Sequence, residues 1–319
     1  MIMYISLIGG LVILILAGDL LVRGSISIAE RVGIPKIVIG LTIVSFGTSA
    51  PELMVSLKSA FHGNDGIAVG NVVGSNITNV LLVLGIPSFI RATSCSDRGT
   101  GGSAIFMVFV TVIFAYFLLQ GRLEHFHGFI LLSLLGCFLA WTVYETRTQK
   151  KAGLCSGCDA DEMVEGVPKH LGVALVFTII GMIGLPLGGF LTVLGGEQIA
   201  RAWHVSEAAI GITVIALGTS LPELATTLVA AMRNHSAIAL GNVIGSNIFN
   251  ILAIMGLTTA IIPLNVHPQI MSFDVWVMLG TALLIIPTAL FCFKIGKKTG
   301  LAFVISYFAF VGLVLAPGT

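Results

Sequence analysis

The sequence predicts an all-α membrane protein in which ten transmembrane helices form two inverted five-helix repeats. Three observations lead to this fold class: an apolar composition, ten apolar stretches of membrane-spanning length, and two unusual polar motifs that each occur twice. Of 319 residues, 56% are hydrophobic and only 10% are charged, whereas soluble domains contain about 25% charged residues. Because so little polar surface is available, we expect the chain to lie in a lipid bilayer.

Ten apolar stretches divide the chain, each near the roughly 20 residues that a helix needs to cross the hydrocarbon core. They are residues 3–27, 36–60, 66–90, 103–120, 126–146, 170–198, 208–232, 237–263, 271–293 and 299–317. No basic residue precedes the first stretch and no small-residue cleavage site follows it, so we interpret it as a span rather than a signal peptide. We therefore expect a first repeat over residues 1–146, a polar loop over 147–168 and a second repeat over 169–319.

Two polar motifs recur at a constant separation of 171 residues. They are GTSAPE and GTSLPE, at residues 47–52 and 218–223, and GNVVGSN and GNVIGSN, at residues 70–76 and 241–247. An ungapped comparison of residues 42–85 with 213–256 gives 21 identities in 44 positions. The identities concentrate in Gly, Thr, Ser, Pro, Glu and Asn, which chance similarity between apolar helices does not produce. The sequence therefore indicates an internal duplication.

The orientation of the repeats follows from the number of spans and from the basic residues. Five spans per half is an odd number, so the second half enters the membrane from the opposite side, as in many secondary transporters. With the N-terminus outside, thirteen basic residues fall at inner ends and three at outer ends. The inner set is Arg23, Arg31, Lys36, Arg91, Arg98, Arg147, Lys150, Lys151, Lys169, Arg233, Lys294, Lys297 and Lys298, and the outer set is Lys58, Arg122 and Arg201. This distribution predicts that both termini lie outside and that the 147–168 loop is cytoplasmic.

The first motif places a carboxylate and a helix breaker inside a span. A carboxylate near the bilayer centre costs on the order of 2.5–3.5 kcal/mol, so Glu52 and Glu223 are expected to face a partner or water rather than lipid. The proline before each glutamate lacks an N–H group and frees backbone carbonyl groups nearby. Irregular backbone at this depth is tolerated where it lines a cavity or packs in protein. Hydroxyl oxygens are added by Thr48, Ser49, Thr219 and Ser220.

The second motif supplies further oxygen atoms. Ser75 and Asn79 lie four residues apart, as do Ser246 and Asn250, so each pair shares a helical face. For Asn71, Asn76, Asn242 and Asn247, a packing role and a role at the site both stay open. Hard cations such as Ca²⁺ take six to eight oxygen ligands, and two glutamates balance one divalent charge. No cysteine or histidine joins this set, which argues against zinc and copper.

The paired motifs resemble the α-repeats of the sodium/calcium exchanger family, within the cation/calcium exchanger superfamily. The chain is similar in particular to the compact prokaryotic-type members, and the resemblance covers nearly all of it. It implies broken helices 2, 3, 7 and 8 around a central ion site, and an antiporter that exchanges Ca²⁺ for Na⁺ by alternating access. We therefore expect no enzyme activity, cofactor, nucleic acid or obligate protein partner, and a location in a prokaryotic inner or plasma membrane.

The resemblance also implies roles for individual residues. Glu52 and Glu223 correspond to the central Ca²⁺ ligands, and Thr48 and Thr219 to residues that contribute backbone carbonyls. The flanking Na⁺ sites correspond to Ser49, Ser220, Ser75, Ser246 and Asn79, with the carbonyls of Ser45 and Ala216 added. The chain departs from the family at Asn250, where well-studied members commonly have Asp. The site therefore has two candidate carboxylates rather than three.

Several alternatives stay open. Protons or K⁺ are alternative coupling ions, another divalent cation is an alternative to Ca²⁺, and acidic residues also suit a passive cation channel. An intramembrane enzyme using Ser49 or Ser220 is disfavoured because no base is placed nearby to activate a serine. Asp19 and Glu197 are expected to snorkel or to pair with arginines, and Asp274 to lie at the interface. The CSGC sequence, with Cys155 and Cys158, is interpreted as an incidental loop feature.

Overall fold

The structure, a computed structural model, describes residues 2–93, 100–151, 167–202 and 216–315. The described part is almost entirely helical, as predicted. Eight of its helices are long and apolar enough to cross a membrane, and a ninth span results when Lys36–Thr48 and Ala50–Phe61 are taken as one bent span. The predicted seventh span begins within residues 203–215, which lie outside the described residues, as do Cys155 and Cys158.

The helices of the first half match the predicted spans closely. They are α1 (Ile2–Val32), α2 (Lys36–Ile39), the π-helical η1 (Gly40–Val44), α3 (Ser45–Thr48), α4 (Ala50–Phe61), α5 (Asp65–Thr78), the π-helical η2 (Asn79–Val83), the 3-10 helix η3 (Pro87–Phe89), α6 (Thr100–Leu119) and α7 (His125–Lys151). Four of the elements, α2, η1, α3 and α4, together make the second predicted span. The interruption between α3 and α4 lies at Ser49, within the GTSAPE motif and two residues before its proline, which cannot continue the preceding helix.

The second half repeats this pattern of long and interrupted helices. Its elements are α8 (Leu171–Ala202), α10 (Ala216–Thr219), α11 (Leu221–Met232), α12 (Ser236–Phe249), the π-helical η5 (Asn250–Met255), α13 (Gly256–Ile261), the π-helical η6 (Ile270–Asp274), α14 (Val275–Leu284), α15 (Ile286–Phe291) and α16 (Lys297–Leu315). The π-helical segments η2 and η5 begin at Asn79 and Asn250, which are equivalent positions of the duplication. Such local widenings of a helix are frequent at functional sites.

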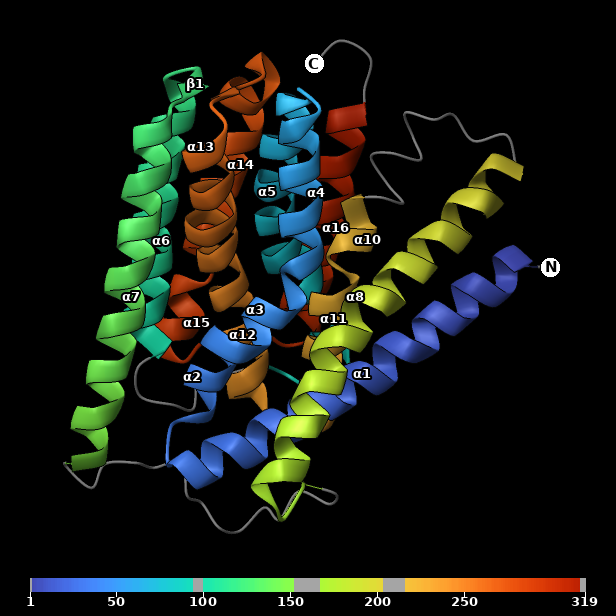
Figure 1. Cartoon of the computed structure of the whole chain (residues 1–319), viewed down its shortest axis with the longest axis vertical. Helices are drawn as coiled ribbons and strands as arrows, with labels where there is room; N and C mark the ends of the chain where they lie inside the picture. Colours follow the sequence, from blue (N-terminus) through green and yellow to red (C-terminus); the bar gives the residue numbers. More distant parts are fainter. Residues whose placement is uncertain (1, 94–99, 152–166, 203–215, 316–319) are drawn as a thin grey trace.

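Helices α1 and α8 lie side by side and run obliquely across the upright bundle formed by the other long helices (Figure 1). Small residues allow their backbones to touch. A Cβ atom at Gly24 would lie 2.7 Å from the Ala174 carbonyl oxygen, and one at Gly181 would lie 2.8 Å from that of Ala17. Close backbone approach through small residues is a common way for helices to associate in lipid.

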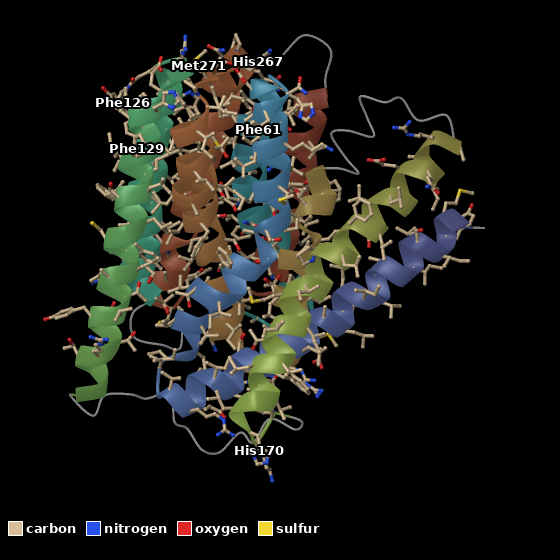
Figure 2. All side chains as sticks on the ribbon, in the orientation of Figure 1. Phe61, Phe126, Phe129, His170, His267 and Met271 are labelled. Atoms are coloured by element: carbon tan, nitrogen blue, oxygen red, sulfur yellow. The ribbon has the colours of Figure 1, made fainter. Side chains whose placement is uncertain are left out.

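Burial separates the central helices from the peripheral ones. In the most apolar part of Ser236–Ile261, 94% of residues are buried, against 17% for Lys297–Val314. Outer helices expose large apolar side chains, such as Phe126 and Phe129 on α7, which point away from the bundle (Figure 2). The helices that carry the two repeated motifs therefore form the protein interior, and peripheral helices such as α7 and α16 cover it.

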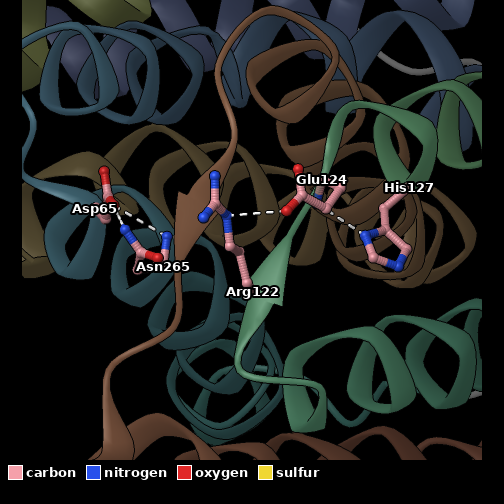
Figure 3. A network of polar contacts seen from close by, with 5 residues as sticks. All are labelled: Asp65, Arg122, Glu124, His127 and Asn265. Carbon is pink, nitrogen blue, oxygen red and sulfur yellow. Dashed lines mark hydrogen bonds and ion pairs between the residues drawn. The ribbon is translucent and has the colours of Figure 1, made fainter.

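A short antiparallel strand pair closes one end of the bundle. Strand β1 (Arg122–Leu123) pairs with β2 (Leu264–Asn265). Asp65, in the first turn of α5, accepts hydrogen bonds from the backbone N–H of Asn265 at 3.0 Å and from its side chain at 2.8 Å (Figure 3). The exposed Arg122 pairs with Glu124 at 3.0 Å. We call this the hairpin end.

An ion-pair network joins α1 to α11 at the opposite half of the bundle. Asp19 pairs with Arg23 at 3.1 Å, which confirms the expected pairing on α1. The same carboxylate lies 2.5 Å from the guanidinium of Arg233, directly after α11. The sequence did not indicate this second pair, because 214 positions separate the two residues. The network links the α1 and α8 pair to the central helices.

The turn between α11 and α12 buries a histidine next to basic residues. His235 precedes the first turn of α12, and its Nε2 atom has no hydrogen-bond partner in the described part of the chain. Burial, together with the positive charges of Lys36 and Arg233, lowers the pKa of His235 to about 4. The equivalent position of the first half is Asn64, which precedes α5 in the same way.

We predict that His235 makes the protein sensitive to mild acid. The unfolded chain binds the proton with the ordinary pKa of about 6.5, so stability falls as the pH drops from about 6.5 towards 4. The decrease in Tm between pH 7.5 and 5 is expected to be smaller in His235→Asn than in the wild type, by on the order of 2–5 °C. Thermal unfolding of detergent-purified protein measures this. Equal decreases in the two proteins would contradict the assignment.

Candidate cation site

The two helix breaks place Glu52 and Glu223 in the protein interior. Ser49 has φ −83° and ψ 8°, and Ser220 has φ −88° and ψ 3°, so both leave regular helical geometry just before a new helix begins. In the first half, the segments on either side of the break meet at a bend of 46°. Each glutamate lies in the first turn of the following helix and is 0% exposed. The motifs therefore place two fully buried carboxylates at helix N-termini, where the helix dipole favours negative charge.

Side chains of the first motif contact the second half of the chain directly. The Ser49 hydroxyl donates a hydrogen bond to Glu223 Oε1 at 3.1 Å. The Thr48 hydroxyl donates to Asn242 Oδ1 at 3.3 Å and lies 3.4 Å from the Ser246 hydroxyl. Glu52 and Glu223 are close enough for their charges to interact. The two related motifs thus meet in one polar cluster.

Asn71 and Asn242 hold the backbone beside each glutamate in equivalent ways. The Asn71 amide donates to the Glu52 carbonyl at 3.1 Å and to the Ser56 hydroxyl at 2.9 Å. The Asn242 amide donates to the Glu223 carbonyl at 3.4 Å and to the Thr227 hydroxyl at 3.0 Å. All of these partners are related by the 171-residue offset. The sequence left the role of these asparagines open, and the structure shows them joining each broken helix to the next.

Several buried oxygen atoms have no hydrogen-bond partner in the described part of the chain. They are Glu52 Oε1 and Oε2, Glu223 Oε2, the Ser220 hydroxyl, Asn79 Oδ1 and Asn250 Oδ1. Unpaired buried acceptors are costly, at roughly 1–3 kcal/mol each and more for charged groups. Among the described residues, no three or more His, Cys, Asp or Glu side chains group as metal ligands. Any cation bound here would therefore have neutral oxygens and two carboxylates as ligands.

The remaining residues predicted for the site occupy the same broken helices. Ser45 is fully buried in α3 and donates to the carbonyls of Gly40 at 2.6 Å and Asn242 at 3.1 Å. Thr219 ends α10, which Ala216 begins, and Ser246 is fully buried in α12. Ser75 is buried in α5 and lines a cavity. Hydrogen bonds, several of them through Asn242, thus connect Ser45, Thr48, Ser49, Glu223 and Ser246. Within the part of the chain that the structure describes, no side-chain hydrogen bond joins Ser75 to them.

A cavity of about 890 Å³ leads into the protein from the hairpin end. Its wall includes Asp65 and His267 at that end, the latter visible near Met271 in Figure 2, and it continues along α5 to Asn71 and Ser75. Ten residues of helix separate Asp65 from Ser75, or roughly 15 Å. Asp274, which is half-buried, also lines the cavity. Polar side chains therefore follow the cavity from the hairpin end to a helix of the cluster.

Known proteins similar to this chain identify its family. The family described as sodium/calcium exchanger protein matches residues 2–144 and 173–316. The inner membrane protein YrbG of Escherichia coli is 35% identical over 92% of this chain and 90% of its own length. The sodium/calcium exchanger MaX1 of Methanosarcina acetivorans is 30% identical over 97% of both chains. The solved structure of the sodium-calcium exchanger NCX_Mj, soaked with Na⁺ and Ca²⁺, superposes with a TM-score of 0.84 at 30% identity, covering 99% of both chains.

We predict that neutralising either glutamate stabilises the cation-free protein. Glu52→Gln or Glu223→Gln removes one of two interacting buried charges, and the new amide finds acceptors among the unpartnered oxygens of the cluster. In buffer without Na⁺ and divalent cations, Tm should rise by at least about 2 °C. Glu124→Gln, on the exposed surface of the hairpin end, is the matched control and should change Tm little. Lower Tm values for both interior variants would show that the carboxylates are satisfied without a cation.

Proposed function

The chain belongs to the sodium/calcium exchanger family, and on this basis we propose that it exchanges Ca²⁺ for Na⁺ across the membrane by alternating access. One observation carries the proposal: two fully buried carboxylates present three oxygen atoms without a hydrogen-bond partner in the described residues, beside neutral hydroxyl and amide oxygens. This donor set suits a hard cation that needs several oxygen ligands. The names of MaX1 and NCX_Mj as sodium/calcium exchangers support the choice of ions.

We assign the ligands as follows. Glu52 and Glu223 bind Ca²⁺, with backbone carbonyls of Thr48 and Thr219 completing its shell. Na⁺ sites lie on either side of it, and their ligands are Ser45, Ser49, Ser75, Asn79, Ala216, Ser220, Ser246 and Asn250, with Ser45 and Ala216 contributing carbonyls. Because the two carboxylates are shared, Ca²⁺ and a full set of Na⁺ ions compete for the same negative charge. Competition of this kind is what an exchanger needs.

The architecture proposed for transport is ten spans in two inverted repeats, over residues 1–146 and 169–319. Equivalent hydrogen bonds of Asn71 and Asn242 support it, since each half builds the same local connection around its own glutamate. The cavity that reaches Ser75 from the hairpin end supports ion entry from that side. Helices α1 and α8, packed on each other through small residues, then move as a pair against the central helices.

We predict that Glu52→Gln and Glu223→Gln reduce Na⁺-driven Ca²⁺ uptake to background while both variants still insert and purify. Each substitution removes half of the charge that balances Ca²⁺. Uptake of ⁴⁵Ca²⁺ into proteoliposomes loaded with Na⁺ measures this, and Glu124→Gln should transport normally. Near-normal uptake by either interior variant would show that the ion pathway lies elsewhere.

The same assay separates the proposed function from its alternatives. Gradients of Na⁺, K⁺ and protons are imposed one at a time on the wild-type protein. Uptake driven only by the Na⁺ gradient supports Na⁺ coupling, whereas uptake driven by the proton gradient, or dependent on K⁺, identifies one of the other exchangers. Ca²⁺ entry that follows its own gradient without any counter-ion would indicate a channel.

Membrane orientation gives an independent prediction. We propose that both termini lie outside, that residues 147–168 are cytoplasmic and that the hairpin end faces outward, because basic residues concentrate at the other ends of the spans. In a background without the five native cysteines, an impermeant maleimide added to intact cells should label His267→Cys but not Thr148→Cys, and both should react after lysis. Both positions are exposed in the structure. Labelling of both in intact cells would exclude the inverted arrangement.

A further inference from the structure

Four buried asparagines form two reciprocal hydrogen bonds between the halves of the protein. The Asn79 amide group donates to Asn247 Oδ1 at 3.1 Å, and the Asn250 amide group donates to Asn76 Oδ1 at 3.1 Å. The four side chains are at most 2% exposed. The two bonds are equivalent by the 171-residue offset, which relates the donor Asn79 to the donor Asn250 and the acceptor Asn76 to the acceptor Asn247. These bonds join α5 and η2 to α12 and η5.

These two hydrogen bonds determine which atom of the Asn79 and Asn250 amide groups stays without a partner. An asparagine side chain has one acceptor oxygen and one NH₂ donor group. Asn79 and Asn250 use the donor across the interface, and their own Oδ1 atoms are buried without a hydrogen-bond partner in the described part of the chain. Both residues also begin a π-helical segment, where the backbone departs from regular α-helix. Each therefore presents an oxygen, rather than an NH₂ group, away from its partner.

We infer that Asn76 and Asn247 are positioning residues, each holding the amide across the interface so that its oxygen faces the cation. The inference rests on the proposed function, because it takes Asn250 and Asn79 as cation ligands. Without an acceptor at position 76 or 247, the opposite amide is free to turn over and present its NH₂ group. Such a group repels a cation, so loss of the acceptor weakens binding even though no ligand is removed.

The two positioning residues are not equally constrained. The Asn247 NH₂ group lies 3.7 Å from the Met107 sulfur, a weak acceptor, whereas the Asn76 NH₂ group has no partner among the described residues. In this chain the Asn76 oxygen is held by the bond from Asn250, but in an Asn250→Asp variant that donor is gone, and Asn76 can turn its unpaired NH₂ group to the new carboxylate. A carboxylate at position 250 is compatible with Asn76 for this reason, but not with an acceptor-only side chain at position 76.

Substitutions of Asn76 with nearly equal volume separate positioning from packing. Asn76→Asp keeps an acceptor for the Asn250 amide, whereas Asn76→Leu fills the space without one. If Asn76 is a positioning residue, the KM for Ca²⁺ in the Na⁺-driven uptake assay should stay within about threefold of the wild-type value in Asn76→Asp. In Asn76→Leu it should rise about tenfold or more, with a smaller change in kcat. Packing alone predicts the reverse order, because leucine is apolar and aspartate buries a charge. Thr142→Val, which removes a hydrogen bond within α7, should leave KM unchanged.

A double variant provides the second test, which can be made even if Asn76→Leu does not fold or purify. Asn76→Asp and Asn250→Asp should each transport, since a donor remains between the two side chains in either case. Combined, they place two carboxylates face to face without a donor, and KM should rise at least tenfold beyond the product of the single effects. A double variant equal to that product, or a leucine variant equal to wild type, overturns the inference. If the wild-type protein shows no Na⁺-driven Ca²⁺ uptake, the proposed function itself is overturned. That outcome differs from the two above, which overturn only the inference.

Discussion

The central helices are arranged around two buried carboxylates. Glu52 and Glu223 are fully buried, and in the described part of the chain neither forms an ion pair with a lysine or arginine. A carboxylate in this position is tolerated only where other polar groups replace its hydration. The broken helices meet this need because they bring hydroxyl, amide and backbone groups to the same place. Their polar content also requires them to be the central helices, enclosed by the apolar α1, α7, α8 and α16.

The sequence was sufficient to predict an all-α membrane fold and to select candidate site residues, several of which the structure brings into one polar cluster. Membrane spans are long and apolar, so their approximate bounds follow from hydropathy, and the bounds of α6, α7 and α16 agree with the predicted stretches within a few residues. The motif repeated at a fixed offset identified Glu52 and Glu223 because a carboxylate within a span needs a specific environment. The polar cluster of the structure contains the same residue types that the motifs contributed.

Other features depend on tertiary contacts that no local pattern records. The pair between Asp19 and Arg233 joins residues 214 positions apart, whereas the pair between Asp19 and Arg23 follows from helical spacing. The strand pair β1 and β2 is only two residues long on each side, too short to leave a periodic signal. The orientation of the Asn79 and Asn250 amides was equally out of reach, because it depends on an acceptor in the opposite half. Sequence gives the side chains of the cluster, and packing determines which of their atoms remain free.

The duplication shows which interactions the interior requires. Asn71 contacts a serine where Asn242 contacts a threonine, and this difference keeps the hydroxyl group that accepts the bond. At the ends of the same helices the two halves diverge: Asn64 corresponds to His235, and Asp65 to Ser236. Hydrogen-bonding chemistry is thus kept near the glutamates, whereas the residues that begin the same helices differ between the two halves.

Under the proposed exchange, the same buried charge explains why transport is coupled. Enclosing the two ionised carboxylates without a cation leaves their charge uncompensated in a medium of low dielectric constant, which is costly. One Ca²⁺ ion or two Na⁺ ions cancel that charge, so the loaded site is much easier to enclose than the empty one. The conformational change that carries the site across the membrane is therefore favoured only when ions are bound. Asn250 contributes an oxygen but no charge, which limits the compensating charge to that of the two glutamates.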